Sequence, residues 1–384
     1  MQIRRVSDCR AVHRHPEETS AVGHWCRVVC FSVFICCTRW CSAADELPRN
    51  WPKLPISNGV VELPAQEWPF HPAPRHIKVY IYYPFGRLEH VTAKTGLMLT
   101  VHNWGGTEAI GSAEPKVLTE RLDVVSIAVD YLQSGKDEAL ESPDPYDFGY
   151  LQALDVLRGL WYVQQGLKVN KTNFDASRIY ATGGSAGGHV VMMCNKFAPR
   201  TFTCLIDICG PTKLSEDIAY GLAGGSSFNA RYEIKEGLPT SLTIDEREIR
   251  CLSDPRHLAE MKRLGNTTKV IVVHGIDDKT APFADAKELV ESMQHAKLDV
   301  ESVFVGKGQL DGKVFTATGH TIGHRTEIMF RAADKYLKIG SKNYLSRTTS
   351  TDFFRREEIK YETTNGAYVI SYENGYPIGK FVPK

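Results

Sequence analysis

The sequence has almost no net charge and no long block of basic residues. Its 46 Lys and Arg residues are balanced by 45 Asp and Glu residues, so the formal charge is +1 over 384 residues. A nucleic-acid-binding chain normally carries a basic stripe or cluster, and this sequence has none. We therefore do not expect nucleic acid as a partner.

Cysteine is scarce outside the N-terminal segment. Six of the ten cysteines lie in the first 44 residues, and the others are Cys194, Cys204, Cys209 and Cys251. So few cysteines argue against a disulfide-stapled fold at this length. With 42% hydrophobic and 24% charged residues, the chain is expected to be an ordinary globular one that its hydrophobic core stabilises.

The first 44 residues differ from the rest of the chain in composition. Arg27 precedes an apolar run at 28–37, and small residues follow at 42–44. A positive flank, a short apolar core and a small-residue exit predict a secretory signal peptide over residues 1–44, with cleavage near Ala43 or Ala44. The run is too short to span a bilayer. The alternative, a zinc or disulfide cluster, lacks paired Cys-x-x-Cys spacing. We expect an exported protein, periplasmic or extracellular, with no stable membrane span after cleavage.

Short runs rich in Val and Ile alternate with longer helical patterns from residue 75 onward. Most of the runs are continuously hydrophobic, which is typical of parallel strands that are buried on both faces. The alternation predicts an α/β fold with a doubly wound, mostly parallel sheet. The expected strands are 77–84, 96–103, 123–130, 178–185, 204–210, 269–275 and 299–306, and the expected helices are 149–167, 186–197, 283–296 and 326–337.

Three segments depart from this rhythm. Residues 45–74 are rich in Pro and aromatic residues and are expected to form an irregular lead-in. Residues 211–265 are Gly-rich and then charged, and we interpret them as a small cap inserted in a core domain of residues 75–340. The C-terminal extension, 341–384, is polar and contains a candidate hairpin at 367–381.

The sharpest motif is Gly183-Gly184-Ser185-Ala186-Gly187, which lies between an expected strand and an expected helix. This is the pattern G-x-S-x-G, in which a serine at a tight strand-to-helix turn projects its hydroxyl and the glycines leave room for the turn. The following helix directs its first backbone N–H groups at the place where negative charge develops during acyl transfer. The alternative without catalysis is a Gly-rich turn that only allows close packing or binds a phosphate.

A serine nucleophile needs a base and an acid, and both occur downstream in the expected order. The segment 269–282 ends a strand in His274-Gly275 and then supplies Asp277 and Asp278. Here the sequence resembles the α/β-hydrolase superfamily, especially the branch of dienelactone hydrolases and prolyl oligopeptidase-like enzymes, whose pattern is H-G-x-x-D-x-x-V-P. The resemblance implies the α/β-hydrolase fold and makes Asp278 the acid, with Asp277 as the fallback. A solvated loop position is the alternative for both.

The base is expected on the loop after the last strand. His320 lies in the Gly-His context that the superfamily shows, and His324 lies at the start of the final helix. We predict His320 as the base and keep His324 as the fallback.

The oxyanion hole is expected to use two backbone N–H groups. The segment 102–106 resembles the H-G-x-G-G pattern of the superfamily, with Asn103 in place of a glycine, and the alignment pairs the N–H of Trp104 with that of Ala186. We expect Asn103 to tolerate left-handed backbone angles there. Trp104 could also cover the acyl pocket, with ordinary packing as the alternative.

These residues together predict a serine hydrolase that forms an acyl-enzyme. The sequence contains no metal-binding, P-loop or dinucleotide signature, so no metal or organic cofactor is expected. A carboxylic ester on a carbohydrate or an aromatic acid is the expected substrate, because the chain lacks the large N-terminal propeller with which prolyl oligopeptidases select peptides. A prolyl oligopeptidase-like peptidase and a non-catalytic binding protein on the same fold are the alternatives. The segments around 146–163 and 183–199 also resemble an uncharacterised bacterial hydrolase-like family.

Overall fold

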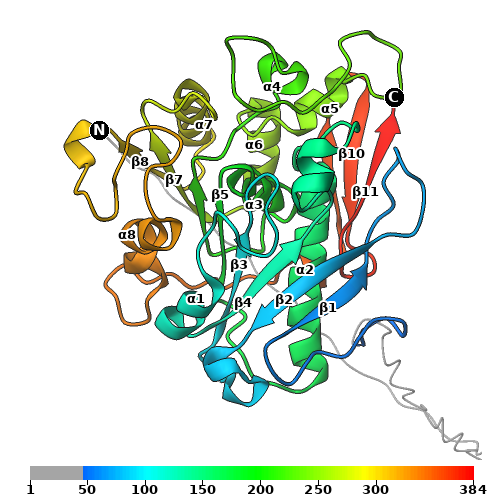
Figure 1. Ribbon diagram of the computed structural model, residues 1–384. Helices are drawn as coiled ribbons and strands as arrows, with labels where there is room; N and C mark the ends of the chain where they lie inside the picture. The colour runs from blue at the N-terminus through cyan, green and yellow to red at the C-terminus, as the bar shows by residue number, and fades with distance from the viewer. Residues whose placement is uncertain (1–45) are drawn as a thin grey trace, which may run out of the picture. The chain divides into compact units, whose positions relative to one another are not determined.

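A twisted sheet of eight strands forms the centre of the described chain (Figure 1). The computed structural model describes residues 46–384, so the predicted signal peptide lies outside the described residues. The strand order is β1-β2-β4-β3-β5-β6-β7-β8; β3 to β8 are parallel to one another, whereas β1 and β2 are antiparallel to their neighbours. The predicted mostly parallel, doubly wound α/β sheet is confirmed. The strands are β1 (Gly59–Pro64), β2 (His76–Tyr82), β3 (Gly96–Val101), β4 (Val124–Asp130), β5 (Ile179–Gly184), β6 (Cys204–Ile208), β7 (Lys269–Gly275) and β8 (Val300–Val305).

Helices cover both faces of this sheet, which explains why its central strands are continuously hydrophobic. In β3, Leu97 and Leu99 belong to the core cluster that includes residues of α2, α3 and α7, whereas Met98 belongs to the cluster with α1 and α8. The helices are α1 (Pro115–Leu122), α2 (Tyr150–Val169), α3 (Ala186–Phe197), α7 (Phe283–His295) and α8 (Arg325–Leu337). Short helical turns occupy Pro84–Gly86, Leu88–His90, Asp137–Glu141 and Lys307–Gln309.

No helix in the range 46–384 combines the length and the apolar character that a membrane span requires.

The lead-in is not irregular throughout, so that expectation is wrong over β1. Val61 pairs with Val79 and Leu63 with Ile77 in an antiparallel ladder, and Leu63 is fully buried. The alternation of buried and accessible positions in β1 is the ordinary strand pattern. The prolines around it hid this signal in the sequence.

The segment between β6 and β7 contains α4 (Glu216–Tyr220), α5 (Ile244–Ile249) and α6 (Pro255–Arg263). Leu214 and Ile218 from this insertion form a separate hydrophobic cluster with Tyr146 and Phe148, which precede α2. The insertion therefore rests on the loop that leads into α2.

The C-terminal extension forms a second, three-stranded antiparallel sheet with the order β11-β10-β9. Its elements are α9 (Asp352–Arg355), β9 (Glu358–Glu362), β10 (Gly366–Ser371) and β11 (Ile378–Pro383). The expected hairpin at 367–381 corresponds to β10 and β11, whereas β9 was not anticipated from the sequence.

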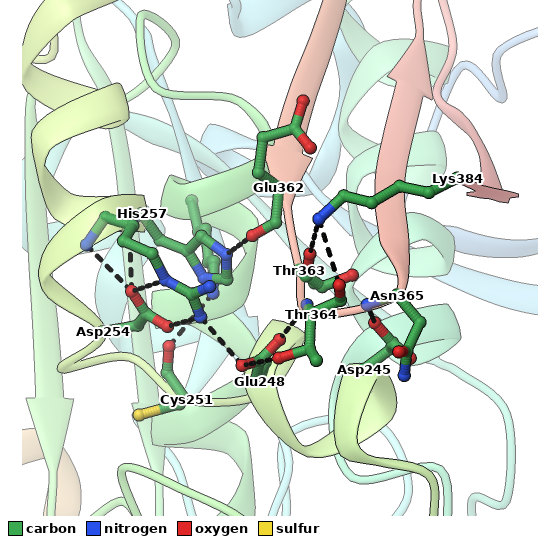
Figure 2. Close-up of polar contacts among 12 residues, drawn as sticks. Asp245, Glu248, Cys251, Asp254, His257, Glu362, Thr363, Thr364, Asn365 and Lys384 are labelled. Carbon is green, nitrogen blue, oxygen red and sulfur yellow. Dashed lines mark hydrogen bonds and ion pairs between the residues drawn. The ribbon is translucent and has the colours of Figure 1, made fainter.

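Polar contacts join this second sheet to the insertion, as Figure 2 shows. Thr364, in the turn between β9 and β10, donates from its N–H and its hydroxyl to Glu248 of α5, at 2.7 and 2.8 Å. Asn365 donates in the same way to Asp245, at 2.8 and 2.9 Å. In α6, the ring Nε2 of His257 donates to the carbonyl of Glu362 at 2.9 Å. The turn of the second sheet is thus fixed to two helices of the insertion.

A buried ion pair attaches α9 to the main domain and allows a test with a matched control. Asp352 accepts hydrogen bonds from the N–H and the Nε of Arg200, at 2.8 and 2.7 Å, and its side chain is fully buried. We expect Asp352→Ala to lower the free energy of unfolding by about 3 kcal/mol or more, since it leaves the Arg200 guanidinium without its buried partner. Glu357 binds the same guanidinium but is 48% exposed, so Glu357→Ala should cost less than about 1 kcal/mol. Urea denaturation measures both, and equal losses would contradict the assignment.

Candidate active site

Ser185 lies at the junction of β5 and α3, at the carboxyl end of the parallel strands. Its backbone is at φ 57° and ψ −129°, outside the regions that a non-glycine residue usually adopts. The Ser185 N–H donates to the carbonyl of Ile208 at 2.9 Å, and its own carbonyl accepts from the N–H of Gly188 at 2.8 Å. Strain of this kind is retained at functional sites when the surrounding structure fixes it.

Gly183 and Gly187 are required by the close approach of backbones around this turn. A Cβ at Gly183 would lie 2.1 Å from the carbonyl oxygen of Gly187, and a Cβ at Gly187 would lie 2.2 Å from the carbonyl oxygen of Val101 in β3. No side chain fits at either position. The G-x-S-x-G pattern in the sequence therefore has a steric cause.

His320 connects Ser185 to Asp278 through its two ring nitrogens. The Nε2 atom lies 2.8 Å from Ser185 Oγ, and the Nδ1 atom lies 2.8 Å from Asp278 Oδ2. The three side chains come from loops after β5, β7 and β8, which meet at one edge of the sheet, where open α/β folds bind their ligands. Ser185 is 7% exposed and the His320 side chain is 22% exposed. The structure thus brings together the three residues that the sequence singled out.

Asp278 is held as an anion by its surroundings. Its Oδ1 accepts from the N–H groups of Thr280 and Ala281, at 2.9 and 3.0 Å. Burial by itself would raise the pKa of Asp278, but hydrogen bonds from His274 and His320 hold that pKa well below its usual range. An acid with a lowered folded-state pKa stabilises the fold above its unfolded value of about 3.9, and this contribution is lost as the pH falls toward the folded-state pKa.

His274 is a neighbour of the site to which the sequence analysis gave no role. Its Nε2 lies 2.8 Å from the carbonyl oxygen of Ala281 and 3.2 Å from Asp278 Oδ2, and its side chain is fully buried. The ring therefore fixes both ends of the loop that carries Asp278. Its position immediately before Gly275, as the first residue of the H-G-x-x-D motif, was the sequence signal that could have identified it.

The fallback residues lie outside the hydrogen-bonded chain of Ser185, His320 and Asp278. Asp277 accepts a hydrogen bond from the Thr318 hydroxyl at 2.6 Å. His324 is an exposed residue that precedes the first turn of α8.

The loop after β3 lies beside the nucleophile turn, since a Cβ at Gly187 would also meet the carbonyl of His102 at 2.4 Å. The N–H groups of Trp104 and Ala186 donate to no other residue in the part of the chain that the structure describes. Free N–H groups of this kind are what an oxyanion hole needs. Asn103 does not adopt left-handed backbone angles; the left-handed residue of the segment 102–106 is Gly105, two residues later, with φ 73°.

His102 is the first residue of this loop, and contacts of its ring hold it in place. Its ring stacks on Tyr131 at 4.0 Å, and its Nε2 lies 2.7 Å from the Ser134 hydroxyl. Burial lowers the pKa of His102 to about 4. His102 therefore stays neutral near pH 7 and acts as a packing residue.

Three aromatic side chains form a wall beside His320. Trp104 stacks between Tyr146, with ring centroids 3.9 Å apart, and Phe228, at 4.9 Å. The Phe228 ring meets His320 edge-on at 5.9 Å. Tyr146, Trp104 and Phe228 are called the aromatic wall below. Only Trp104 was anticipated: the resemblance noted for residues 146–163 gave Tyr146 no role, and Phe228 lies in the insertion, where no motif was found.

Cys209, His274 and Asp278 are the one group of three metal-ligand residue types gathered closely in the described chain. Burial raises the pKa of the Cys209 thiol to about 11, so the thiol stays protonated near neutral pH. His274 and Asp278 are already hydrogen-bonded to the site's own loop. Since metal ligands must be deprotonated and free to turn toward the ion, this group is a poor metal site.

The steric argument for the turn predicts the effect of one added methyl group. Gly187→Ala should lower the free energy of unfolding by about 2 kcal/mol or more, because backbone atoms of β3 and its loop must move. Gly308→Ala is the control, since no heavy atom lies within 4 Å of a Cβ there. Thermal unfolding should show a lower midpoint for the first variant only; an unchanged midpoint for Gly187→Ala would refute the close approach.

The fold is similar to that of solved hydrolase structures. An uncomplexed acylaminoacyl peptidase from Pyrococcus horikoshii matches with a TM-score of 0.50 and 16% identity, over 75% of this chain and 43% of the peptidase. A puromycin-hydrolyzing peptidase from Mycobacterium tuberculosis gives 0.46 and 18% identity, over 73% of this chain and 40% of that one. An arylesterase gives 0.42 and 16% identity, over 75% and 85%. The match at 0.50 and the order of the strands show the fold of the α/β hydrolases, and this chain spans less than half the length of the two peptidases.

No curated protein matches this sequence. A family profile described as "Protein of unknown function (DUF2920)" matches residues 141–375, which include Ser185, Asp278 and His320. This match covers more than half of the chain, so the protein belongs to that family.

Proposed function

We propose that this protein is a serine hydrolase that works through an acyl-enzyme. The observation that carries the proposal is the single imidazole of His320, which lies within hydrogen-bond distance of both Ser185 Oγ and Asp278 Oδ2. A nucleophile, a base and an orienting acid in this arrangement are the requirements of acyl transfer.

The proposed reaction begins with attack of Ser185 Oγ on the substrate carbonyl carbon. His320 Nε2 takes the hydroxyl proton, while Asp278 fixes the ring and stabilises its charged form. The N–H groups of Trp104 and Ala186 bind the oxyanion. The C–O bond to the leaving group then breaks, and the same proton passes from His320 to that oxygen. Water, activated by His320, attacks the acyl-enzyme, releases the acid and restores Ser185.

A carboxylic ester with a compact or aromatic acyl group is the proposed substrate. Phe228 of the aromatic wall meets the His320 ring edge-on, so the wall offers a flat apolar surface beside the base for the acyl group. An aromatic acid ester, or a carbohydrate esterified by such an acid, suits this surface. A peptide substrate remains the second candidate and is separated by the first experiment below.

The nucleophile is tested by covalent labelling and turnover. A fluorophosphonate probe should label the wild-type protein and not Ser185→Ala, because the probe reacts with an activated serine. With p-nitrophenyl acetate and butyrate, Ser185→Ala should lower kcat/KM at least about 10³-fold. Equal labelling of the two proteins would overturn the nucleophile. Cleavage of a prolyl p-nitroanilide without cleavage of either ester would replace the esterase by a peptidase.

The base is tested by comparing two histidines that lie a few residues apart. His320→Ala should lower kcat for the same esters at least about 10³-fold, since no base would then accept the serine proton. His324→Ala should keep a rate close to that of the wild type, because His324 is exposed at the start of α8. The reverse pattern would move the base to His324 and leave the nucleophile unaffected. Thermal unfolding of both variants controls for loss of fold.

A further inference from the structure

Residues of the lead-in, the insertion and the C-terminal sheet line a cavity away from the triad. In Figure 1, α5 of the insertion lies next to β10 and β11 of that sheet. The volume of the cavity is about 530 Å³, within the range of about 300–1,000 Å³ that is usual for small-molecule sites. It is called the side cavity below. None of the triad residues lines it; its walls include Trp68, Tyr150, Asp245, Arg250, Tyr368 and Phe381.

Aromatic rings form much of the wall of the side cavity. Tyr368 meets Tyr150 at 4.9 Å and Phe381 at 5.1 Å. Across the cavity, the lead-in contributes Trp68 and Phe70, whose rings lie 5.5 Å apart. Phe381 is a large apolar residue, yet it is 40% exposed to solvent. Flat apolar surfaces at a hollow that opens to solvent are typical of a ligand site.

Charged groups lie between these rings, and most of them already have partners within the protein: the Arg250 guanidinium lies 3.4 Å from the Asp147 carboxylate, and the exposed Lys380 lies 3.9 Å from Glu358. Arg250 is 4% exposed and donates to the carbonyls of Asp147 and Glu246, at 2.6 and 2.9 Å. Asp245 is bound by Asn365, and the Glu246 carboxylate accepts from Thr243. A charged ligand would compete with these contacts, whereas a neutral ligand with many hydroxyl groups could add hydrogen bonds to them.

We propose that the side cavity binds a neutral carbohydrate. A pyranose ring presents an apolar face of C–H groups, which packs on Trp68, Phe70 or Phe381, and a rim of hydroxyl groups, which hydrogen-bond to the polar groups among them. The wall formed by α5 and β10 is preformed, because the contacts of Figure 2 fix α5 to the turn before β10. A preformed site loses little free energy to ordering when the ligand binds.

The side cavity and the catalytic serine are separated by the segment 146–148. Tyr146 belongs to the aromatic wall and Phe148 contacts His189 of α3, whereas Asp147, between them, lines the side cavity. Carbohydrate binding in the side cavity is thus distinct from acyl transfer, and it stands or falls independently of the chemistry proposed for Ser185.

The test is titration calorimetry of the full chain with four neutral probes: cellohexaose, xylohexaose, mannohexaose and chitohexaose. We expect at least one to bind, with Trp68→Ala and Phe381→Ala each weakening its affinity at least about tenfold. Phe85→Ala is the matched control, because Phe85 is 88% exposed and lies outside the side cavity. It should bind like the wild type.

Three results would overturn the proposal. The first is no binding of any probe at about 10 mM, well above the weak limit of specific recognition. The second is binding that persists in both aromatic variants, which would place the carbohydrate elsewhere. The third is an equal loss in Phe85→Ala. Wild-type ester turnover and an unchanged thermal midpoint in Trp68→Ala and Phe381→Ala show that lost binding reflects the cavity and not the fold. A chain that fails to react with fluorophosphonate but binds the probe would refute the hydrolase and leave the carbohydrate site intact.

Discussion

The rest of the site depends on one close approach of backbone segments, which leaves no room for a side chain at Gly183 or Gly187. Without side chains there, β5 turns into α3 directly against the carbonyl of Val101. That approach places Ser185 beside the loop after β3, whose Trp104 N–H is unpaired, and at the first N–H of α3. Steric closeness, more than any single attractive contact, thus sets the distance between the Ser185 hydroxyl and the backbone N–H groups of Trp104 and Ala186. The strain at Ser185 is the local cost of this arrangement.

Electrostatic interactions then set the protonation states of the buried carboxyl groups near the site. Asp278 accepts two backbone hydrogen bonds in addition to those of the histidine rings, so it stays ionised although its side chain is fully buried. Beneath the turn, burial raises the pKa of Asp207 to about 6. The fold therefore favours the protonated form of Asp207 more than the unfolded chain does. Its contribution to stability is present at low pH and is lost as the pH rises through that value. The two carboxyl groups differ because His320 and His274 both contact Asp278, while Asp207 has the N–H of Gly210 as its hydrogen-bond donor.

The sequence sufficed for the parts of the molecule that repeat a physical pattern. Buried parallel strands show as hydrophobic runs, and the nucleophile turn shows as glycines around Ser185, so the fold class and the three hydrogen-bonded residues could be anticipated. Strand β1 was missed because prolines surround it. Strand β9 has the alternating pattern of a half-buried strand, but it was passed over because charged residues flank its buried Ile359 and Tyr361. Phe228 could not have been found at all: it lies beside His320 only because the insertion folds back over the site. Contacts made by long excursions of the chain leave no local pattern.

Those added segments, the lead-in, the insertion and the C-terminal extension, share one feature, which is that each of them packs against residues from other parts of the chain. Trp51 of the lead-in packs on Trp161 of α2 and stacks on Tyr376 from the C-terminal sheet. Arg200 forms a buried ion pair with Asp352 of α9. Glu248 of the insertion accepts a hydrogen bond from Thr364 in the turn between β9 and β10. Each added segment is therefore stabilised by its contacts with the hydrolase core and with the other added segments. Such mutual support leaves irregular space between the segments, and the side cavity is that space, lined with aromatic rings that the hydrolase core did not need.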